Sequence, residues 1–413
     1  FGHSPYAAIE GKLSQTVQTG RIIFGYLFLV SSYSYFMSVA QALGRFFLPA
    51  LAPALFNISL IIFSFLPQNW WPFPAVSLAW AALVGGVLQV ILVLIVIYRM
   101  GFWPHFSLQA KKLPVRSVFN RFIPAALGLS GLSLIGLINV YFAGWLEEGS
   151  HTYIYYGDRL LELPRSLIAV SLGSALVPAL SRLKAEKREE EFLKTTGYYL
   201  DFLIFLTLPC AVVLALLAQP VVELLFQRGQ FDEIAVAHTA SVIQVYSLVL
   251  IFSSGGRALS SGFFAADKNW HCAFGNGIYV LFHGFLAWYL TTRYGLSGLI
   301  WATALSSLFY FCFLLFLSSR YVGRLPLRLS VIRFVKNLPG LTLLALVLLC
   351  YQPLLAFTQN ALPLFWSRLL ILTLLFSVGG GLYLLMGIFV KQEMAREFIQ
   401  LFSLRFQGKS ETR

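Results

Sequence analysis

Four charged side chains in an apolar stretch are the residues best suited to chemistry in this sequence. The segment YYGDRLLELPRS, Tyr155–Ser166, contains Asp158, Arg159, Glu162 and Arg165. In a helix, with about 100° per residue, all four project within about a third of the circumference. This spacing allows ion pairs of Arg159 with Glu162 and of Glu162 with Arg165. Guanidinium groups bind phosphate oxygens through a planar fork of donors, so the pattern favours an anion-binding site.

The sequence offers little for catalysis or for a metal. It contains no HExxH, GxSxG, P-loop or DxD motif, and the carboxylates of Asp158 and Glu162 lie beside arginines that would keep them ionised. We therefore expect no enzyme activity and no cofactor. The histidines are scattered without metal-ligand spacing, and the cysteines, which lie in apolar runs, are expected to be buried small hydrophobes; they are His3, His105, His151, His238, His271 and His283, and Cys210, Cys272, Cys312 and Cys350.

The elements that must position these charges are membrane helices. Of 413 residues, 58% are hydrophobic and only 11% are charged, whereas a soluble domain has about 25% charged residues. The apolar runs are long enough to span a bilayer and lack the alternation of strands. The sequence therefore predicts an all-α polytopic membrane protein. The eleven expected transmembrane helices are 21–42, 47–66, 75–98, 119–145, 152–181, 197–218, 234–264, 270–291, 296–319, 332–353 and 364–390.

The basic residues are distributed by topology. Most of the 30 Lys and Arg residues fall in one alternating set of loops, and the net charge of +13 follows from them. Because cytoplasmic loops are rich in Lys and Arg, this set and the C-terminus are expected to be cytoplasmic and Phe1 to be outside. No nucleic-acid partner is needed to explain the charge. The opposite set of loops contains only Lys12, Arg21, Arg228, Arg293 and Arg368.

The charged segment must avoid lipid. Each ionised side chain costs about 2.5–3.5 kcal/mol at the bilayer centre, so four facing lipid would cost on the order of 10 kcal/mol. They are expected to line a wet cavity as a functional site, or alternatively to form a neutral cluster that pins helices together. Arg257, in the mid-span stretch SSGGRALSSGFF, has no acid nearby in the sequence and is a further candidate for anion binding. Snorkelling or a distant ion pair is the alternative for Arg257.

Helix breakers and amphipathic segments complete the pattern. Irregular backbone at membrane depth survives only around a cavity or within protein, so clustered breakers next to polar residues are of interest. We expect the outside segment 219–233 to lie along the surface. The tail, with Met394 and Phe398 at helical spacing, is expected to form an interfacial helix. The breakers are Pro49, Pro53, Pro124, Pro164, Pro178 and the triplet Gly379–Gly381.

Four segments resemble the MurJ (MviN) family, the lipid II flippase branch of the multidrug/oligosaccharidyl-lipid/polysaccharide exporter superfamily. They are RFFLPALAPALFNISLI (45–61), RFIPAALGLSGLSLIGLINVYFAGWL (121–146), YYGDRLLELPRSLIAVSLGSALVPALSRL (155–183) and LFQRGQFD (225–232). The family has fourteen transmembrane helices in two six-helix lobes plus two extra helices. Eleven spans with an outside start would correspond to helices 4–14, so the sequence is expected to lack the first three.

The resemblance implies a domain organisation and residue roles. It divides the chain into 1–100 (rest of the N-terminal lobe), 101–118 (basic cytoplasmic linker), 119–320 (C-terminal lobe), 321–390 (two extra helices) and 391–413 (amphipathic cytoplasmic tail). Arg159 would contact the substrate diphosphate, with Asp158 and Glu162 holding it. Arg165 and Arg257 would add to this binding site. The implied gating or structural residues are Arg45, Pro49, Pro53, Asn57, Pro124 and Pro164.

The resemblance implies a flippase that moves the undecaprenyl-diphosphate-linked peptidoglycan precursor lipid II across the bacterial inner membrane by alternating access. Its partners would be this lipid and the surrounding membrane lipids, with cell-wall synthesis proteins as further candidates, and the protein is expected to be a monomer. No nucleotide motif is present, so an ion gradient or the membrane potential would drive transport, with the coupling ion unspecified. The open alternatives are another exporter branch for polysaccharide lipids or drugs, a membrane glycosyltransferase, and a non-transporting scaffold.

Overall fold

The computed structural model describes residues 11–102 except 46, residues 133–359 and 362–399, and the single positions 123 and 131. Every regular element in this part of the chain is helical. Eight of its helices are long and apolar enough to cross a membrane. The predicted all-α polytopic membrane fold is confirmed. The number of eleven spans stays a prediction, since much of the first half of the fourth expected span, 119–145, lies outside the described residues.

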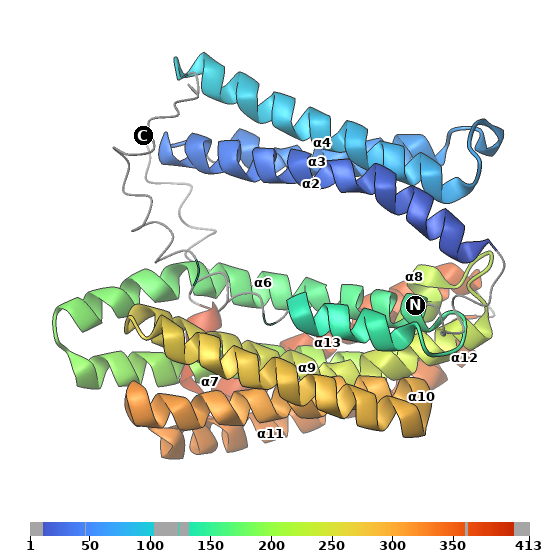
Figure 1. The fold of residues 1–413 in the computed structure, drawn as a ribbon. Helices are drawn as coiled ribbons and strands as arrows, with labels where there is room; N and C mark the ends of the chain where they lie inside the picture. The colour runs from blue at the N-terminus through green and yellow to red at the C-terminus, as the bar shows by residue number, and fades with distance from the viewer. Residues whose placement is uncertain are drawn as a thin grey trace, which may run out of the picture. The chain divides into compact units, whose positions relative to one another are not determined.

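The chain divides into two compact units, residues 1–115 and 116–413. In the first unit α4 (Pro74–Arg99) packs against both α2 (Lys12–Ala42) and α3 (Phe47–Ser64) (Figure 1). Small residues make this possible: a Cβ added at Gly85 would lie 2.9 Å from the Cα of Phe56 in α3. Close backbone approach at glycine is a common way for membrane helices to associate.

The second unit is built around α9, which packs against α6, α7 and α10, while α11 packs against α13 and α7 (Figure 1). The helix Ser133–Ala143 also belongs to this unit. Its elements are α6 (Ser150–Ala185), α7 (Glu189–Leu216), α8 (Ala218–Phe226), α9 (Glu233–Ala265), α10 (Asn269–Tyr321), α11 (Leu327–Leu349), α12 (Tyr351–Thr358) and α13 (Leu364–Phe389).

Helix α10 consists of two helical segments joined at Gly295. A single straight helix of its 53 residues would be about 80 Å long, far more than the roughly 30 Å of a bilayer core. Gly295 has φ 56° and ψ −133°, a backbone conformation that glycine adopts without steric cost. The two segments correspond to the separately predicted spans 270–291 and 296–319.

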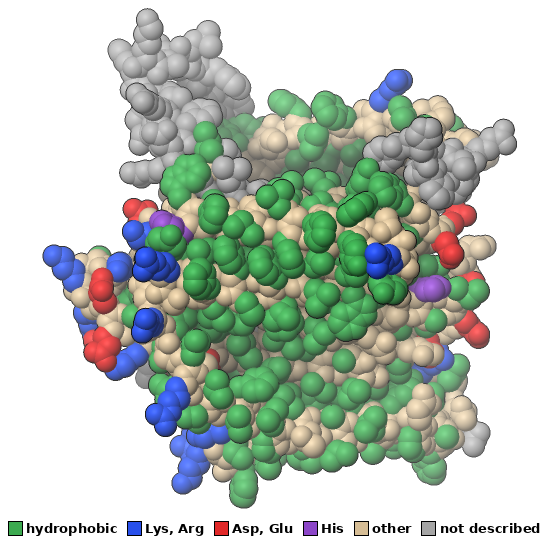
Figure 2. All heavy atoms as spheres, turned by 60° about the horizontal axis from the view of Figure 1, so that its bottom comes forward, with side chains coloured by type: hydrophobic (Ala, Val, Ile, Leu, Met, Phe, Trp, Pro, Cys, Tyr) green, Lys and Arg blue, Asp and Glu red, His purple; other side chains and the backbone are tan. Residues whose placement is uncertain are grey.

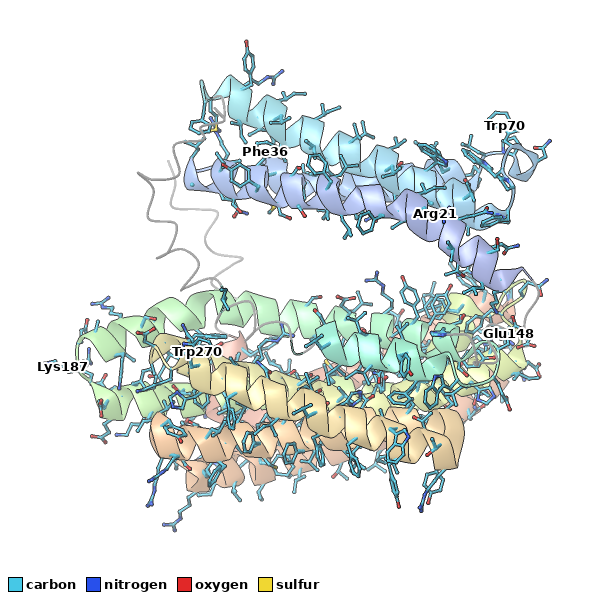
Figure 3. The ribbon with its side chains drawn as sticks, viewed as in Figure 1. Arg21, Phe36, Trp70, Glu148, Lys187 and Trp270 are labelled. Carbon is cyan, nitrogen blue, oxygen red and sulfur yellow. The ribbon has the colours of Figure 1, made fainter. Side chains whose placement is uncertain are left out.

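The surface of the second unit and its helix ends fit a membrane protein. Figure 2 shows hydrophobic side chains spread over the face formed by α10 and α11, with most charged side chains near the helix ends. In Figure 3, Glu148 and Lys187 lie at opposite ends of α6, and Trp270 lies toward the Lys187 end. If successive loops alternate between the two sides of the membrane, Glu148 and Lys187 must lie on opposite sides and Lys187 and Trp270 on the same side, as they do here. Which end is cytoplasmic stays a prediction.

Several predicted helix breakers do not interrupt their helices. Pro53 lies inside α3, Pro164 and Pro178 lie inside α6, and Gly379–Gly381 lies inside α13, each within continuous helix. Membrane helices often tolerate such residues, and the helices continue through these positions. Lipid offers the backbone no other hydrogen-bond partner, so a helix continues past a local defect. Pro124 lies outside the described residues.

The start of the C-terminal tail packs on protein. Residues 393–399 are helical, and Met394 and Ala395 are completely buried beside Phe202 and Phe205 of α7 and Tyr383 of α13. Met394 thus faces the unit, and the interfacial position of the tail stays a prediction. Residues 400–413 lie outside the described part.

Replacing Gly157 with alanine is expected to destabilise the protein by about 1–3 kcal/mol through overpacking. The added Cβ would lie 2.5 Å from Cγ1 of Val242, so α6 would be pushed away from α9. The measurement is the melting temperature in detergent. Gly380→Ala is the matched control: Gly380 is also helical, a Cβ there meets nothing within 4 Å, and alanine favours the helix. Equal melting temperatures for the two variants would contradict the close packing.

Candidate functional site

Helix α6 separates an apolar face from a charged one. Leu160 and Leu161 are buried in a core cluster with Val242 and Ile243 of α9, whereas Asp158, Arg159 and Glu162 are exposed. The charges therefore project away from the α6–α9 contact. Because α9 fixes the rotation of α6 through this packing, the charged residues share one surface of the second unit, as the helical spacing predicts.

Arg159 is held by two neighbours on its own helix. Its Nη1 donates to Oε2 of Glu162 at 2.8 Å, and its Nε donates to the hydroxyl of Tyr155 at 3.3 Å. The guanidinium carbon lies 5.4 Å from the centroid of the Tyr155 ring. The predicted pair of Arg159 with Glu162 is confirmed. Both side chains are more than half exposed, so the pair is open to a ligand but partly neutralised.

Arg165 approaches Asp158 and not the predicted Glu162. Its Nη1 lies 3.6 Å from Oδ1 of Asp158, two turns earlier. Side chains on a helix point toward its N-terminus, so Arg165 extends back along the line that it shares with Asp158. Its side chain is only 20% exposed, and its Nε is buried without a hydrogen-bond partner. Arg165 therefore has an unused donor in a partly dry setting.

Arg257 adds a second cation to this setting. It lies on α9, is half-buried, and is close enough to Arg165 to repel it electrostatically. Among the described residues no ion pair joins Arg257 to a carboxylate, whereas Arg165 has Asp158 within ion-pair distance. Two partly desolvated cations near one exposed carboxylate favour an anion between them. Figure 1 shows α6 and α9, the helices that bring them together, in one unit.

Two buried tyrosines belong to the same setting and were not predicted. Tyr246 of α9 interacts electrostatically with Asp158 and Arg165, and its hydroxyl is buried. Tyr279 of α10 also interacts with Arg165. In the sequence they are single tyrosines in apolar spans, and only the packing of α9 and α10 against α6 reveals their place.

The other predicted residues are dispersed. Pro164 is half-buried on α6, directly before Arg165. In the first unit, Pro49 is buried and its carbonyl accepts a hydrogen bond from the hydroxyl of Tyr33 at 3.1 Å, which gives it a structural contact. The gating or structural role expected for Pro164, Pro49 and the other residues of this group stays a prediction. The remaining members of this group, all exposed in the first unit, are Arg45, Pro53 and Asn57.

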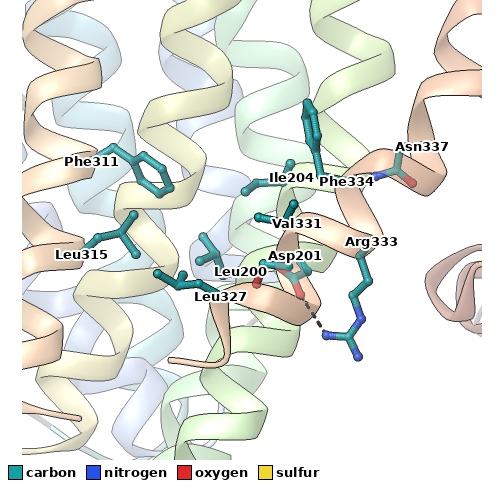
Figure 4. Close-up of a pocket in the computed structure, with 11 residues that line it drawn as sticks. Leu200, Asp201, Ile204, Phe311, Leu315, Leu327, Val331, Arg333, Phe334 and Asn337 are labelled. Atoms are coloured by element: carbon teal, nitrogen blue, oxygen red, sulfur yellow. Dashed lines mark hydrogen bonds and ion pairs between the residues drawn. The ribbon is translucent and has the colours of Figure 1, made fainter. Parts of the chain in front are cut away.

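A separate pocket of about 280 Å³ lies between α7, α10 and α11. Figure 4 shows its mostly apolar lining, with Asp201 beside Arg333 at one edge. Nη1 of Arg333 donates to Oδ2 of Asp201 at 2.8 Å. Because this arginine already has a carboxylate partner, the pocket is a weaker anion site than the face around Arg165. The described residues contain no group of three potential metal ligands.

The fold is that of a helical, polytopic membrane protein, and its charged face lies on α6. A solved structure described as lipid II flippase MurJ in an inward closed conformation aligns with a TM-score of 0.66 and 21% identity, over 89% of this chain and 72% of the other. An inward-facing MATE family multidrug transporter aligns with a TM-score of 0.60 and 15% identity, over 75% and 73% of the two chains. These two likenesses show the fold.

The sequence matches the family model for the lipid II flippase MurJ over residues 4–373. The chain belongs to the MurJ family. A probable lipid II flippase MurJ from Bdellovibrio bacteriovorus is 36% identical over 318 residues, covering 77% of this chain and 61% of that protein. A second, from Buchnera aphidicola, is 32% identical and covers 62% of this chain and 50% of its own length. The chain thus spans about half to three-fifths of these relatives.

Proposed function

We propose that this protein is a transporter of the bacterial inner membrane that moves lipid II, a lipid-linked diphosphate, from one leaflet to the other. The observation that carries the proposal is the pair of partly buried cations Arg165 and Arg257, of which only Arg165 has a carboxylate, that of Asp158, within ion-pair distance among the described residues. Membership of the MurJ family supports the choice of substrate. The C-terminus is proposed to be cytoplasmic because the basic loops lie on that side.

The proposed mechanism follows from the cost of moving charge through hydrocarbon. A diphosphate cannot cross the bilayer core unaided, since an isolated charge pays a large desolvation free energy there. Arg165 and Arg257 would replace the hydration of the diphosphate with charge-assisted hydrogen bonds. Arg159 would join them by exchanging Glu162 for a phosphate oxygen. The isoprenoid tail would stay in lipid while the lobes expose the site to each side in turn.

Transport is favoured over the alternatives by the chemistry of the charged face. A glycosyltransferase needs a positioned acid or base, and the carboxylates of Asp158 and Glu162 are engaged with arginines. A drug antiporter for organic cations would be expected to carry acids without flanking arginines. We therefore assign the charged face to binding and translocation of an anion.

The test is translocation by the full chain in lipid vesicles. A fluorescent undecaprenyl-diphosphate disaccharide is placed in both leaflets, and a membrane-impermeant quencher reports how fast the inner pool becomes accessible. We expect protein-dependent exchange of the diphosphate lipid and much slower exchange of an uncharged undecaprenyl glycoside. Equal exchange of both lipids would point to unspecific scrambling. Formation of a new glycan product would support the glycosyltransferase and contradict our proposal.

A further inference from the structure

The pocket between α7, α10 and α11 is an apolar slot between helices that do not pack closely on each other. Helix α11 packs against α7 and α13 and not closely against α10. The space left between them is the pocket of about 280 Å³. Phe311 and Leu315 of α10 line one side of it, and Leu327, Val331 and Phe334 of α11 line another (Figure 4). The slot therefore offers an apolar ligand two helical walls.

Aromatic side chains mark the level at which the membrane interface crosses these helices. Trp270 near the start of α10 and Tyr321 at its end are both exposed. The ring centroids of Tyr321 and His271 lie 4.1 Å apart, so the two ends of α10 meet at one level. Exposed Trp and Tyr are typical of the headgroup region. Phe311 precedes Tyr321 by almost three helical turns, about 15 Å, so the pocket extends from this level into the hydrocarbon.

At the headgroup level the pocket is bordered by positive charge. Arg320 lies in the last turn of α10, Arg324 in the segment that joins the two helices, and Arg328 in the first turn of α11. All three are exposed, and residues 320–337 contain no Asp or Glu. Among the described residues no ion pair joins these three arginines to a carboxylate, whereas Arg333 has two carboxylate partners. Figure 2 shows Lys and Arg side chains at the lower left, at one end of the face formed by α10 and α11.

The slot and the charges together fit one amphipathic ligand. Leu327, Val331 and Phe334 recur at helical spacing and form an apolar stripe toward the pocket, and Arg328 follows Leu327 directly, beside this stripe. A small anion would leave the slot unused, and an uncharged apolar molecule would leave the arginines without a partner. Basic residues alone would follow from topology, but topology requires no apolar slot beside them. Basic residues beside a slot between transmembrane helices suit an anionic phospholipid.

We propose that this pocket binds an anionic phospholipid from the leaflet on the side of the basic loops. One acyl chain lies in the slot between α10 and α11, and the phosphate contacts Arg324 and Arg328. The bound lipid fills the seam where α10 and α11 do not pack, and so joins the two helices. The transported lipid is a poorer occupant, because its proposed site, Arg165 and Arg257, lies on α6 and α9.

The first test compares headgroups on the full chain in detergent. Native mass spectrometry measures binding of phosphatidylglycerol and of phosphatidylcholine with identical acyl chains, and we expect tighter binding of phosphatidylglycerol. The double variant Arg324→Gln, Arg328→Gln should lose about 30-fold in this affinity, a factor of about five for each arginine near anionic lipid. The control Arg99→Gln, Arg182→Gln removes two exposed arginines elsewhere and should bind as the native protein. Equal losses for the two double variants would indicate general surface charge and overturn the proposal.

The second test blocks the slot without changing the charge. Val331 lines the pocket and is 61% exposed, so Val331→Trp fills the slot from its edge and should abolish saturable binding of phosphatidylglycerol. Val335→Trp is the matched control, because Val335 lies one turn further along α11, is 53% exposed and does not line the pocket. Glycerol 3-phosphate, which has no acyl chains, should not compete. Competition by it, or native binding by Val331→Trp, would show a charged surface without a lipid slot and contradict the proposal.

A crosslinking measurement remains decisive if Val331→Trp fails to fold. Phosphatidylglycerol with a photoreactive group at the end of one acyl chain should label the native chain near Phe311 and Leu315. Labels spread evenly over the lipid-facing helices would refute a defined site. An excess of undecaprenyl phosphate should leave the labelling unchanged, and its displacement by that lipid would assign the pocket to the transported lipid instead. None of these measurements requires translocation, so their outcome is independent of whether the protein is a flippase.

Discussion

Replacing Arg165 with glutamine is expected to weaken binding of a lipid-linked diphosphate by about 10-fold to 150-fold, since a hydrogen bond to a charged group contributes about 1.5–3 kcal/mol. Arg165 is the arginine on α6 with a buried donor that no described residue satisfies, and it is only 20% exposed, so little solvent screens its charge. The dissociation constant of a fluorescent undecaprenyl-diphosphate disaccharide, measured in detergent, checks this. Glutamine retains hydrogen-bond donors, so the loss would report the charge and the fork geometry.

The comparison with Arg159→Gln makes this prediction specific. Arg159 is more exposed and already paired with Glu162 at 2.8 Å, so a ligand must displace the glutamate and the net gain is smaller. We expect a weaker effect than for Arg165→Gln. Arg228→Gln is the control, because Arg228 is remote in sequence from both arginines and binds the carbonyl of Leu225. Equal losses for all three variants would indicate general electrostatic attraction and exclude a defined site.

The double change of Arg165 and Arg257 to glutamine tests whether the two arginines act together. If one diphosphate bridges them, the free-energy losses should not add, because the first substitution already removes part of the bridged geometry. Relief of the repulsion between the two cations in the empty site would add a stabilising contribution to each single variant. Strictly additive losses would mean that the arginines bind separate groups.

The positions of the helices could be predicted because lipid leaves the backbone few choices. Helix α4 covers 74–99 against a predicted span of 75–98, and α9 covers 233–265 against 234–264. The apolar stretch 270–319 is also too long for one transmembrane helix, so two spans were predicted, and the structure has a kink between them at Gly295. The charged face of α6 followed from helical spacing alone, including the ion pair between Arg159 and Glu162.

What the sequence could not supply are contacts between segments far apart in the chain. The second half of α6, all of α7 and α8 and most of α9 separate Arg165 from Arg257 in the sequence, and their proximity depends on how α6 packs against α9. The same holds for His283, which in the sequence is one of six scattered histidines and in the structure joins Asn139 to Ser306. Helical periodicity places a residue on a face but does not say which helix covers that face.

Replacing Asp201 with alanine is expected to lower the free energy of unfolding by about 1.5–3 kcal/mol, the usual contribution of a hydrogen bond to a charged group. Asp201 is only 5% exposed and accepts from Nη1 of Arg333 at 2.8 Å, which joins α7 to α11. Without it, Arg333 keeps Glu393, whose side chain is 71% exposed and therefore well solvated. The measurement is the melting temperature of the full chain in detergent.

Two comparisons show whether the loss arises from a buried charge. The double variant Asp201→Leu, Arg333→Met removes both charges, and we expect it to recover most of the stability because an apolar pair can replace a buried ion pair at little cost. The exposed pair of Arg182 with Glu186 has the same 2.8 Å separation, yet Arg182→Ala should leave the melting temperature unchanged, since solvent screens exposed pairs. If Arg182→Ala destabilised the protein as much as Asp201→Ala, burial would not be the cause. If instead the double variant stayed as unstable as Asp201→Ala, the ion pair would be required for the geometry of the α7–α11 contact beside the pocket in Figure 4.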